Sequence, residues 1–275
     1  GENRMSVIKD AANLNTRMRE VVPLVHNITN YVTVNDCANA LLAIGASPIM
    51  ADDIREASDI TAISSALVIN IGTLNQRTVE SMIASGRTAN QLGIPVVFDP
   101  VGAGASAFRN ETVERILQEV KISILRGNLS EVSYVAGLSA AAKGVDVSEE
   151  DAANDPVDAA CQEARRLGCT VGVTGAVDIV TDGNRVAKIH NGHPLMAKVT
   201  GTGCMTSAIT AGYAGMQEDM WTAATAGILS MGLAGEIAYG RAAHMGTGSF
   251  RTGIIDGLSS LNETLMEEMA KVEEM

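Results

Sequence analysis

A glycine-rich segment late in the chain has the composition of a site for a phosphate anion. Gly201, Thr202 and Gly203 stand directly before Cys204, and a run of small and apolar residues that predicts a helix follows. Two glycines at a helix start let successive backbone N–H groups converge, and the helix dipole adds positive potential there. Such an anion hole suits the charge that develops on a phosphoryl group during its transfer. The alternative is a glycine-rich helix start with a small buried cysteine.

A second polar segment, residues 126–131 (RGNLSE), follows a predicted strand and opens a predicted helix. Asn128 and Glu131 are three positions apart, so they share one face of the first helical turn. Paired oxygen ligands beside a phosphate site suit Mg²⁺ that is held largely through waters. The alternative is that Glu131 only stabilises the helix N-terminus, where acidic residues are common.

Two further glycine clusters follow predicted strands, where open α/β sheets bind ligands. Residues 102–107 fit the loose dinucleotide fingerprint G-x-G-x-x-A, but Asp99 and Pro100 separate them from the strand, unlike in a Rossmann turn. In the segment 173–176 (VTGA), Thr174 could offer its hydroxyl and its N–H to a nucleotide phosphate, or the segment could be a plain hairpin turn. The pattern G-x-x-x-x-G-K-[ST] does not occur in the sequence, which excludes a P-loop kinase.

The charge balance argues against binding of nucleic acid or anionic lipid by electrostatic attraction. The 275 residues carry 32 acidic and 20 basic side chains, for a formal net charge of -12, and 46% are hydrophobic. No run of Lys or Arg offsets this charge, so neither nucleic acid nor a membrane is an expected partner.

The stretch 221–243 is rich in Ala and Gly, and a buried helix explains it better than a membrane span. Four cysteines without a C-x-x-C pair indicate a reduced, cytoplasmic enzyme.

Short apolar strands that alternate with helices must position these segments. Near-continuous apolar runs predict strands that are buried on both faces, as in parallel sheets, at 65–71, 95–98, 122–125, 169–173 and 177–181, the last in a hairpin with 185–189. Capping and glycine signals predict helices at 31–44, 76–92, 111–120 and 156–167, and one that follows Thr202 or Gly203 and runs to Met216. Two more helices are expected after these, and an amphipathic terminal helix at 261–275. The acidic segment 148–155 is expected to be a solvated loop and helix start. We therefore predict one α/β domain over residues 1–275, with a three-layer αβα architecture and a mainly parallel central sheet.

Four motifs occur in order along the chain: VHNITN at 25–30, FDPVGAG at 98–104, RGNLSE at 126–131 and GTGC at 201–204. Together they resemble the hydroxyethylthiazole kinase family of the ribokinase-like superfamily, and the resemblance covers residues 20–260. Most ribokinase-like enzymes have Asp at the position of Cys204, whereas many thiazole kinases are similar to this chain in having Cys. The resemblance implies a ribokinase-like fold without a separate lid domain.

The resemblance also implies an activity, which is ATP-dependent phosphorylation of the hydroxyl of 4-methyl-5-(2-hydroxyethyl)thiazole in thiamine salvage. Carried over motif by motif, it implies that Arg126 and Thr174 contact ATP. It likewise implies that Asn27, Met50 and Gly201 line the thiazole pocket.

A metal, a catalytic group and an assembly are implied in the same way. Asn128 and Glu131 would organise Mg²⁺, through water, with Asp99 nearby. Cys204 would accept the proton of the substrate hydroxyl or orient that hydroxyl. Members of the family look like homotrimers whose substrate sites lie between subunits, so the same assembly is expected here.

Several alternatives stay open on the sequence. Within the same fold, a hydroxymethylpyrimidine kinase, a pyridoxal kinase or a nicotinamide-hydrate repair enzyme is possible, although Cys204 argues against all three. An NADP oxidoreductase would use residues 102–107, and a non-catalytic nucleotide-binding module is a third class. His190 and His193 form H-x-x-H without further ligand candidates, which disfavours a metal site, and His26 is expected to be hydrogen-bonded at the end of a strand.

Overall fold

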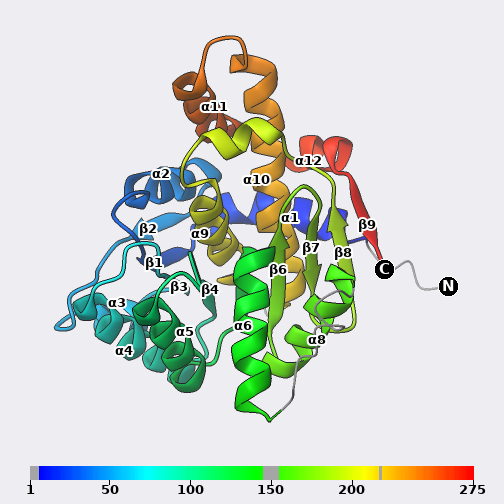
Figure 1. Ribbon diagram of the computed structural model, residues 1–275. Helices are drawn as coiled ribbons and strands as arrows, with labels where there is room; N and C mark the ends of the chain where they lie inside the picture. The colour runs from blue at the N-terminus through cyan, green and yellow to red at the C-terminus, as the bar shows by residue number, and fades with distance from the viewer. Residues whose placement is uncertain (1–5, 145–154, 217–218) are drawn as a thin grey trace.

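The computed structural model describes residues 6–144, 155–216 and 219–275, and its strands form one nine-stranded sheet (Figure 1). The strands are β1 (Leu24–Ile28), β2 (Ser47–Ile49), β3 (Ala66–Asn70), β4 (Val96–Asp99), β5 (Ile124–Asn128), β6 (Thr170–Thr174), β7 (Asp178–Thr181), β8 (Val186–Ile189) and β9 (Val272–Glu274). Their order across the sheet is β2-β1-β3-β4-β5-β6-β7-β8-β9. Strands β1 to β6 pair in parallel, whereas β7, β8 and β9 add an antiparallel edge.

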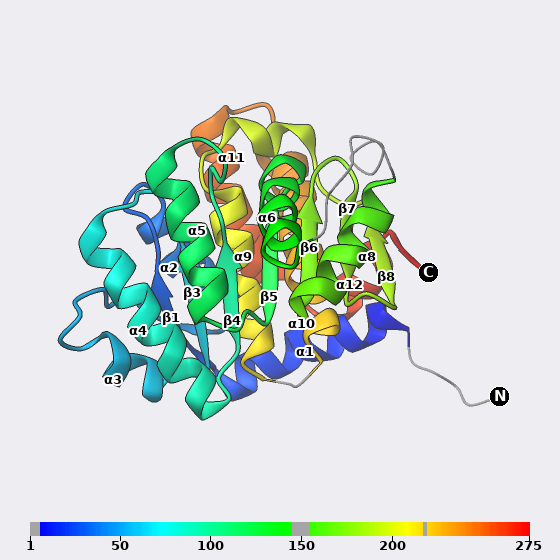
Figure 2. The same ribbon diagram turned by 60° about the horizontal axis from the view of Figure 1, so that its bottom comes forward.

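Helices cover both faces of this sheet (Figure 2). One face carries α1 (Val7–Val21), α2 (Val34–Ile44), α9 (Thr202–Ala214) and α10 (Met220–Ala242), with α11 (Thr247–Ser260) and α12 (Glu263–Met269) packed onto them. The other face carries α4 (Gln76–Leu92), α5 (Ala107–Glu119), α6 (Leu129–Ala142) and α8 (Pro156–Leu167), and α3 (Ala57–Ala62) packs against α4.

Each face has its own hydrophobic core, because successive strand side chains point to opposite sides. In β3, Val68 packs into one core, and Leu67 and Ile69 pack into the other. This arrangement confirms the predicted three-layer αβα class with a mainly parallel sheet. The described residues contain no second sheet that could form a separate lid.

Helix boundaries follow side chains that cap the first turn. Asp155 and Pro156 begin α8 as predicted, since the Asp155 carboxylate accepts the N–H of Val157 at 3.0 Å. The predicted helix 111–120 begins earlier, at Ala107, because the Ser106 hydroxyl accepts the N–H of Arg109. The predicted helix 31–44 begins later, at Val34. The reason is that the Asn30 side chain accepts the N–H of Thr33 and holds the preceding residues in a turn.

All six predicted strands are present, but β1 and β2 were not predicted. In β1, polar His26 and Asn27 interrupt the apolar run that marks the other strands. His26 is nevertheless fully buried, with one ring nitrogen 2.8 Å from the hydroxyl of Thr61 and the other 2.6 Å from the carbonyl of Ala51. The expected hydrogen bonding of His26 is therefore confirmed, but the residue lies in the middle of β1 and not at the end of a strand. These partners are what allow a polar residue in a buried strand.

The C-terminal segment differs from its prediction. A terminal helix over 261–275 is wrong in its second half, since α12 ends at Met269 and Val272–Glu274 form strand β9. β9 pairs antiparallel with β8, with Val272 opposite Ile189, and so occupies a sheet edge that would otherwise leave backbone groups unpaired. The acidic segment 148–155 lies outside the described residues except for Asp155.

The stretch 221–243 forms most of α10, a helix buried on most sides between α9, α11 and the sheet. Its small residues allow this close packing, as expected from the sequence. Among the described residues, no helix combines the length and apolar character needed to cross a membrane.

Glu163 on α8 is buried with an incomplete set of partners, which predicts a pH-dependent stability. Its Oε2 lies 3.3 Å from Arg166, while its Oε1 has no hydrogen-bond partner among the residues that the structure describes. Burial raises the pKa of Glu163 to about 7, although Arg166 opposes this. The ordinary value is 4.5, so the folded chain holds an extra proton between about pH 4.5 and 7 and loses stability as pH rises through that window.

We therefore expect the gain in melting temperature from Glu163→Gln to be several degrees larger at pH 8 than at pH 5. Thermal unfolding at both pH values measures it. Glu267→Gln, at an exposed position on α12, is the control and should give the same small difference at both. A pH-independent effect of Glu163→Gln would contradict the prediction.

Candidate active site

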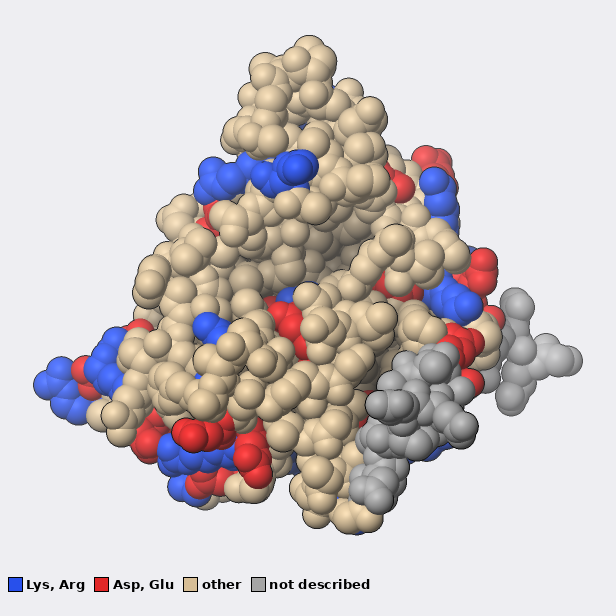
Figure 3. All heavy atoms as spheres, viewed as in Figure 1, with Lys and Arg blue, Asp and Glu red and all other residues tan. Residues whose placement is uncertain are grey.

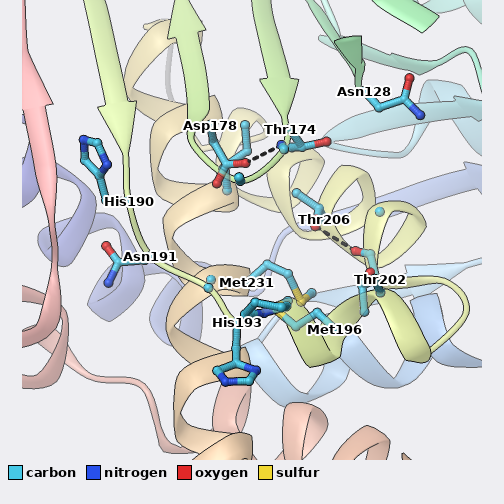
Figure 4. A pocket seen from close by; sticks show the side chains of 18 residues that line it. Asn128, Thr174, Asp178, His190, Asn191, His193, Met196, Thr202, Thr206 and Met231 are labelled. Atoms are coloured by element: carbon cyan, nitrogen blue, oxygen red, sulfur yellow. Dashed lines mark hydrogen bonds between the residues drawn. The ribbon is translucent and has the colours of Figure 1, made fainter. Parts of the chain in front are cut away.

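A cavity of about 720 Å³ opens at the carboxyl ends of β5 and β6, the edge where open α/β sheets bind ligands. Figure 3 shows the surface hollowed here, with walls made mostly of uncharged residues. One end is formed by polar residues from the strand ends and from the first turn of α9: Asn128, Thr174, Thr202 and Gly203. The other end is apolar, with Met196 from the 3-10 helix η1 (Pro194–Lys198) and Ile228 and Met231 from α10 (Figure 4).

Arg126, on β5, holds a fixed positive charge at the polar end. Its side chain is buried, with Nη1 donating to the Thr174 hydroxyl at 2.9 Å, Nη2 to Asp99 Oδ2 at 2.5 Å and Nε to the Ser207 hydroxyl at 2.8 Å. Burial lowers the pKa of Arg126, but the charge and hydrogen bond of Asp99 raise it by more. Burial raises the pKa of Asp99, and Arg126 opposes this. The guanidinium is therefore charged and rigidly oriented in three directions.

The glycines of the 201–204 motif allow two close approaches at the start of α9. A Cβ at Gly203 would lie 3.1 Å from Nη2 of Arg126, so the guanidinium rests against the first turn of the helix. Gly201 has φ +92°, and a Cβ there would lie 2.7 Å from Cγ2 of Thr33. The N-terminus of α9 and Arg126 thus converge on one place, which agrees with the predicted anion hole.

This geometry predicts that Gly201→Ala costs stability and turnover together. The left-handed backbone costs a non-glycine residue about 1–2 kcal/mol, and the contact with Thr33 adds to it. Gly93→Ala is the matched control, since Gly93 has φ +70° but no atom within 4 Å of a built Cβ. We expect both variants to melt lower than the parent, Gly201→Ala by the larger amount, and only Gly201→Ala to lose turnover. Equal melting points with unchanged turnover would contradict this.

Cys204 lies half-buried in the first turn of α9, and its thiol is held by an amide network. Asn30 Nδ2 donates to Sγ of Cys204 at 3.4 Å and to Asn70 Oδ1 at 3.0 Å. Asn30 Oδ1 accepts the N–H and the hydroxyl of Thr33, both at 3.1 Å. The buried Nδ2 of Asn70 has no partner in the described structure. The sulfur is therefore positioned beside polar groups that still have hydrogen-bonding capacity.

Asn128 and Glu131 form a capping box at the start of α6. Asn128 Oδ1 accepts the N–H of Glu131 at 2.8 Å, and Glu131 Oε1 accepts the N–H of Asn128 at 2.9 Å. Glu131 Oε2 accepts the N–H of Gly102 at 2.8 Å, which ties the loop after β4 to α6. Glu131 thus stabilises the N-terminus of α6, which is the alternative role given for it above. Both of its carboxylate oxygens already accept backbone N–H groups. Asp99 is also engaged through Oδ2, whereas its buried Oδ1 has no partner.

Residues 102–107 form a turn that leads into α5 and do not resemble a Rossmann turn. Gly102 and Gly104 have φ +73° and +96°, and the Arg109 side chain lies against Gly102. Nη1 of Arg109 donates to the carbonyls of Ile71 and Val101, so it joins this turn to the end of β3. The turn is therefore held to the end of β3 by hydrogen bonds within the protein.

Asn27 and Met50 lie apart from the cavity, at the carboxyl ends of β1 and β2. Asn27 is buried, and its Nδ2 donates to the carbonyl of Val25 while its Oδ1 has no partner. Met50 is half-buried and packs against the same core as Cys204. Asn27 and Met50 therefore lie outside the group formed by Arg126, Thr174 and Gly203.

His190 and His193 do not come together as metal ligands. His190 Nε2 lies 3.2 Å from Glu273, while His193 stacks on Tyr239 with ring centroids 3.7 Å apart. In the described part of the chain, no three or more His, Cys, Asp or Glu side chains lie together in a way that could hold a metal.

Comparison with known proteins agrees with this geometry. A family model described as the hydroxyethylthiazole kinase family matches residues 15–264. The chain belongs to the hydroxyethylthiazole kinase family. A hydroxyethylthiazole kinase of Ruminiclostridium cellulolyticum is 59% identical over 268 residues, which cover 97% of this chain and 98% of that protein. One from Clostridium beijerinckii is 60% identical over 261 residues, which cover 94% and 95%.

Solved structures share the fold of this hydroxyethylthiazole kinase family member. The structure of the hydroxyethylthiazole kinase from Pyrococcus horikoshii has a TM-score of 0.88 and 41% identity, and the match covers 97% of this chain and 99% of that chain. A pyridoxal kinase from Staphylococcus aureus shares the fold alone, with a TM-score of 0.62 and 14% identity.

Three polar residues of the site were not predicted from the sequence to lie there. Asn70 and Ser207 contact Asn30 and Arg126 from elements distant in sequence, and a small polar residue gives no local signal of such a role. Asp178 had a signal that was missed, since it is an acidic residue at the first position of a buried strand.

Proposed function

We propose that the chain transfers the terminal phosphoryl group of ATP to the hydroxyl of 4-methyl-5-(2-hydroxyethyl)thiazole in thiamine salvage. One observation carries the proposal, namely the convergence of Arg126 and the first turn of α9 at Gly203, with Cys204 next in the same turn. Phosphoryl transfer through a loose transition state needs charge stabilisation and alignment more than covalent chemistry. The rigid guanidinium of Arg126 and the N-terminus of α9 supply the charge stabilisation. Binding of the acceptor alcohol beside Cys204 supplies the alignment.

ATP would occupy the cavity of about 720 Å³, with its phosphates at the polar end. Thr174 and Arg126 are hydrogen-bonded to each other there, so both would contact the phosphates. Gly201, Thr202, Gly203 and Cys204 would form the anion hole around the group in transfer. The apolar end, with Met196 and Met231, suits a nucleobase.

The thiazole alcohol would approach Cys204 from the side of β1 and β2. Asn27, Met50 and Gly201 would line its pocket, and the unpartnered Oδ1 of Asn27 offers it an acceptor. Cys204 would orient the hydroxyl or accept its proton as the phosphoryl group arrives. This acceptor is small and neutral, so the acidic surface does not repel it.

Mg²⁺ fits this site as an ion held through water by Asn128 and Glu131, with Asp99 nearby. Both oxygens of Glu131 accept backbone N–H groups, and Asp99 pairs with Arg126, which favours water-mediated contact over direct ligation. When bound, the ion would neutralise part of the charge of the ATP phosphates.

We further propose a homotrimer with substrate sites between subunits, in a cytoplasmic enzyme that is one domain from residue 1 to 275. Tyr31 and Val32 follow the VHNITN motif and are 79% and 57% exposed, which suits a surface that a neighbouring subunit covers. Four free cysteines suit a reducing compartment, and one sheet running through the described residues supports one domain. Sedimentation equilibrium at the mass of one chain would contradict the trimer.

The direct test is mass spectrometry of a reaction that contains the thiazole alcohol, ATP and Mg²⁺. The expected product is heavier than the alcohol by one phosphoryl group and appears in equal amount with ADP. ADP formation without this product would contradict the proposed acceptor.

A further inference from the structure

Asp178 is a buried carboxylate in the cavity wall that the proposed chemistry does not use. It begins β7, is 8% exposed and lies beside Thr174 (Figure 4). Its Oδ1 accepts the N–H of Gly175 at 2.9 Å and so fixes the turn between β6 and β7. Among the residues that the structure describes, Oδ2 has no hydrogen-bond partner and the carboxylate has no salt bridge.

An acidic group in such a place lacks the solvation that its charge requires. Burial raises the pKa of Asp178 to about 7, with the N–H of Gly175 and the charge of Arg126 opposing this. Burying a carboxylate without a full set of donors costs free energy, so a ligand that brings a donor to Oδ2 is favoured. The donors of ATP are its two ribose hydroxyls and the amino group of its base.

The position of Asp178 along the cavity distinguishes between these donors. Under the proposed function the phosphates would lie at Arg126 and Gly203, and the base would lie at the apolar end near Met231. Asp178 is next to Thr174, at the boundary of the two ends, where the ribose joins the phosphates to the base (Figure 4). A carboxylate is repelled by phosphate, whereas it accepts well from the vicinal hydroxyls of a ribose.

We propose that Asp178 binds the ribose hydroxyls of ATP and makes the enzyme selective for ribonucleotides over deoxyribonucleotides. The inference rests on the proposed function, because it takes the cavity as the nucleotide site. It adds a specificity residue that acts on the phosphoryl donor and leaves the acceptor pocket untouched.

The first test compares ATP, 2′-deoxy-ATP and 3′-deoxy-ATP as donors for the parent enzyme at saturating thiazole alcohol. A hydrogen bond to a charged group predicts a KM about 10-fold higher for at least one deoxynucleotide. Equal KM values for all three would overturn the proposal. Absence of turnover with ATP would instead contradict the proposed function, and calorimetric binding of the same three nucleotides would still test Asp178.

The second test uses Asp178→Asn, which keeps the shape of the side chain and the Oδ1 that accepts from Gly175. It replaces the free acceptor with a donor, so KM for ATP should rise about 10-fold and the preference for ATP over the deoxynucleotides should fall toward one. Asp182→Asn is the control, since Asp182 Oδ1 accepts the N–H of Asn184 at 2.9 Å in the next turn of the same hairpin but does not line the cavity. It should leave the preference unchanged.

Two results with Asp178→Asn would overturn the proposal. An equal rise of KM for all three nucleotides would indicate a structural role of the turn. Full retention of the preference for ATP would place the ribose contact elsewhere. Discrimination against inosine triphosphate that disappears in the variant, with equal use of deoxynucleotides by the parent, would assign Asp178 to the base and would also contradict the inference.

Discussion

Arg126→Met is expected to reduce turnover by at least about 10³-fold, the scale on which arginines that stabilise phosphoryl transfer act. The reason is that one guanidinium joins Asp99, Thr174 and Ser207 and rests against Gly203, so its loss removes the fixed charge from the anion hole. Steady-state kinetics with ATP and the thiazole alcohol measure the effect in kcat/KM. Turnover within about 10-fold of the parent, in a variant that stays folded, would contradict this role.

The same substitution should destabilise the fold, and a second variant separates the two effects. Removing Arg126 leaves the fully buried Asp99 without its cation, which costs about 3–5 kcal/mol. Arg126→Lys keeps a charge for Asp99 but cannot donate to Thr174 and Ser207 at the same time. We expect Arg126→Lys to recover most of the stability, measured by denaturant unfolding, but to remain much slower than the parent. Recovery of turnover in proportion to stability would indicate a purely structural arginine.

Substitutions of Cys204 have the second large expected effect, and they differ by the chemistry of the new side chain. Cys204→Ala removes any proton acceptor and should lower kcat by about 10²-fold or more. Cys204→Asp restores an acceptor that Asn30 Nδ2 can still contact, so it should retain much more activity than Cys204→Ala. Measured KM values for the thiazole alcohol show whether binding is intact in each variant.

Two outcomes would contradict this account of Cys204. Loss of activity in Cys204→Asp with intact substrate binding would show that an acceptor at this position is not sufficient. Parent-like kcat in Cys204→Ala would show that the anion hole alone aligns the hydroxyl and that the thiol has no part in the reaction.

Much of the fold could be predicted because its strands are buried on both faces. The run ALVIN of β3 is fully buried, as expected for a short apolar run that lies between two helices of a parallel sheet. β1 could not be predicted in this way, since His26 and Asn27 are polar residues whose partners come from distant segments. β9 was missed because its three residues form a strand only through pairing with β8.

For the site, too, features set by residues adjacent in sequence could be predicted, whereas contacts between distant segments could not. The glycine motif predicts an anion hole, which stays a prediction, while the structure shows that Gly203 and Thr174 lie against Arg126. The network that holds Cys204 joins Asn30, in the loop after β1, to Asn70 at the end of β3, so no spacing in the sequence could reveal it. Asp178 was missed because an aspartate near a glycine turn is common, although its position at the start of a buried strand was a signal.

The central claim, phosphoryl transfer from ATP to a thiazole alcohol, is tested most directly by substrate-dependent release of ADP. The assay contains ATP, Mg²⁺ and one of three alcohols: the hydroxyethylthiazole, a hydroxymethylpyrimidine or pyridoxal. We predict ADP release with the thiazole alone, and no release with Arg126→Met. Release of ADP with the pyrimidine or with pyridoxal instead would contradict the acceptor pocket at Asn27 and Met50. Absence of ADP release with all three alcohols would contradict the proposed reaction.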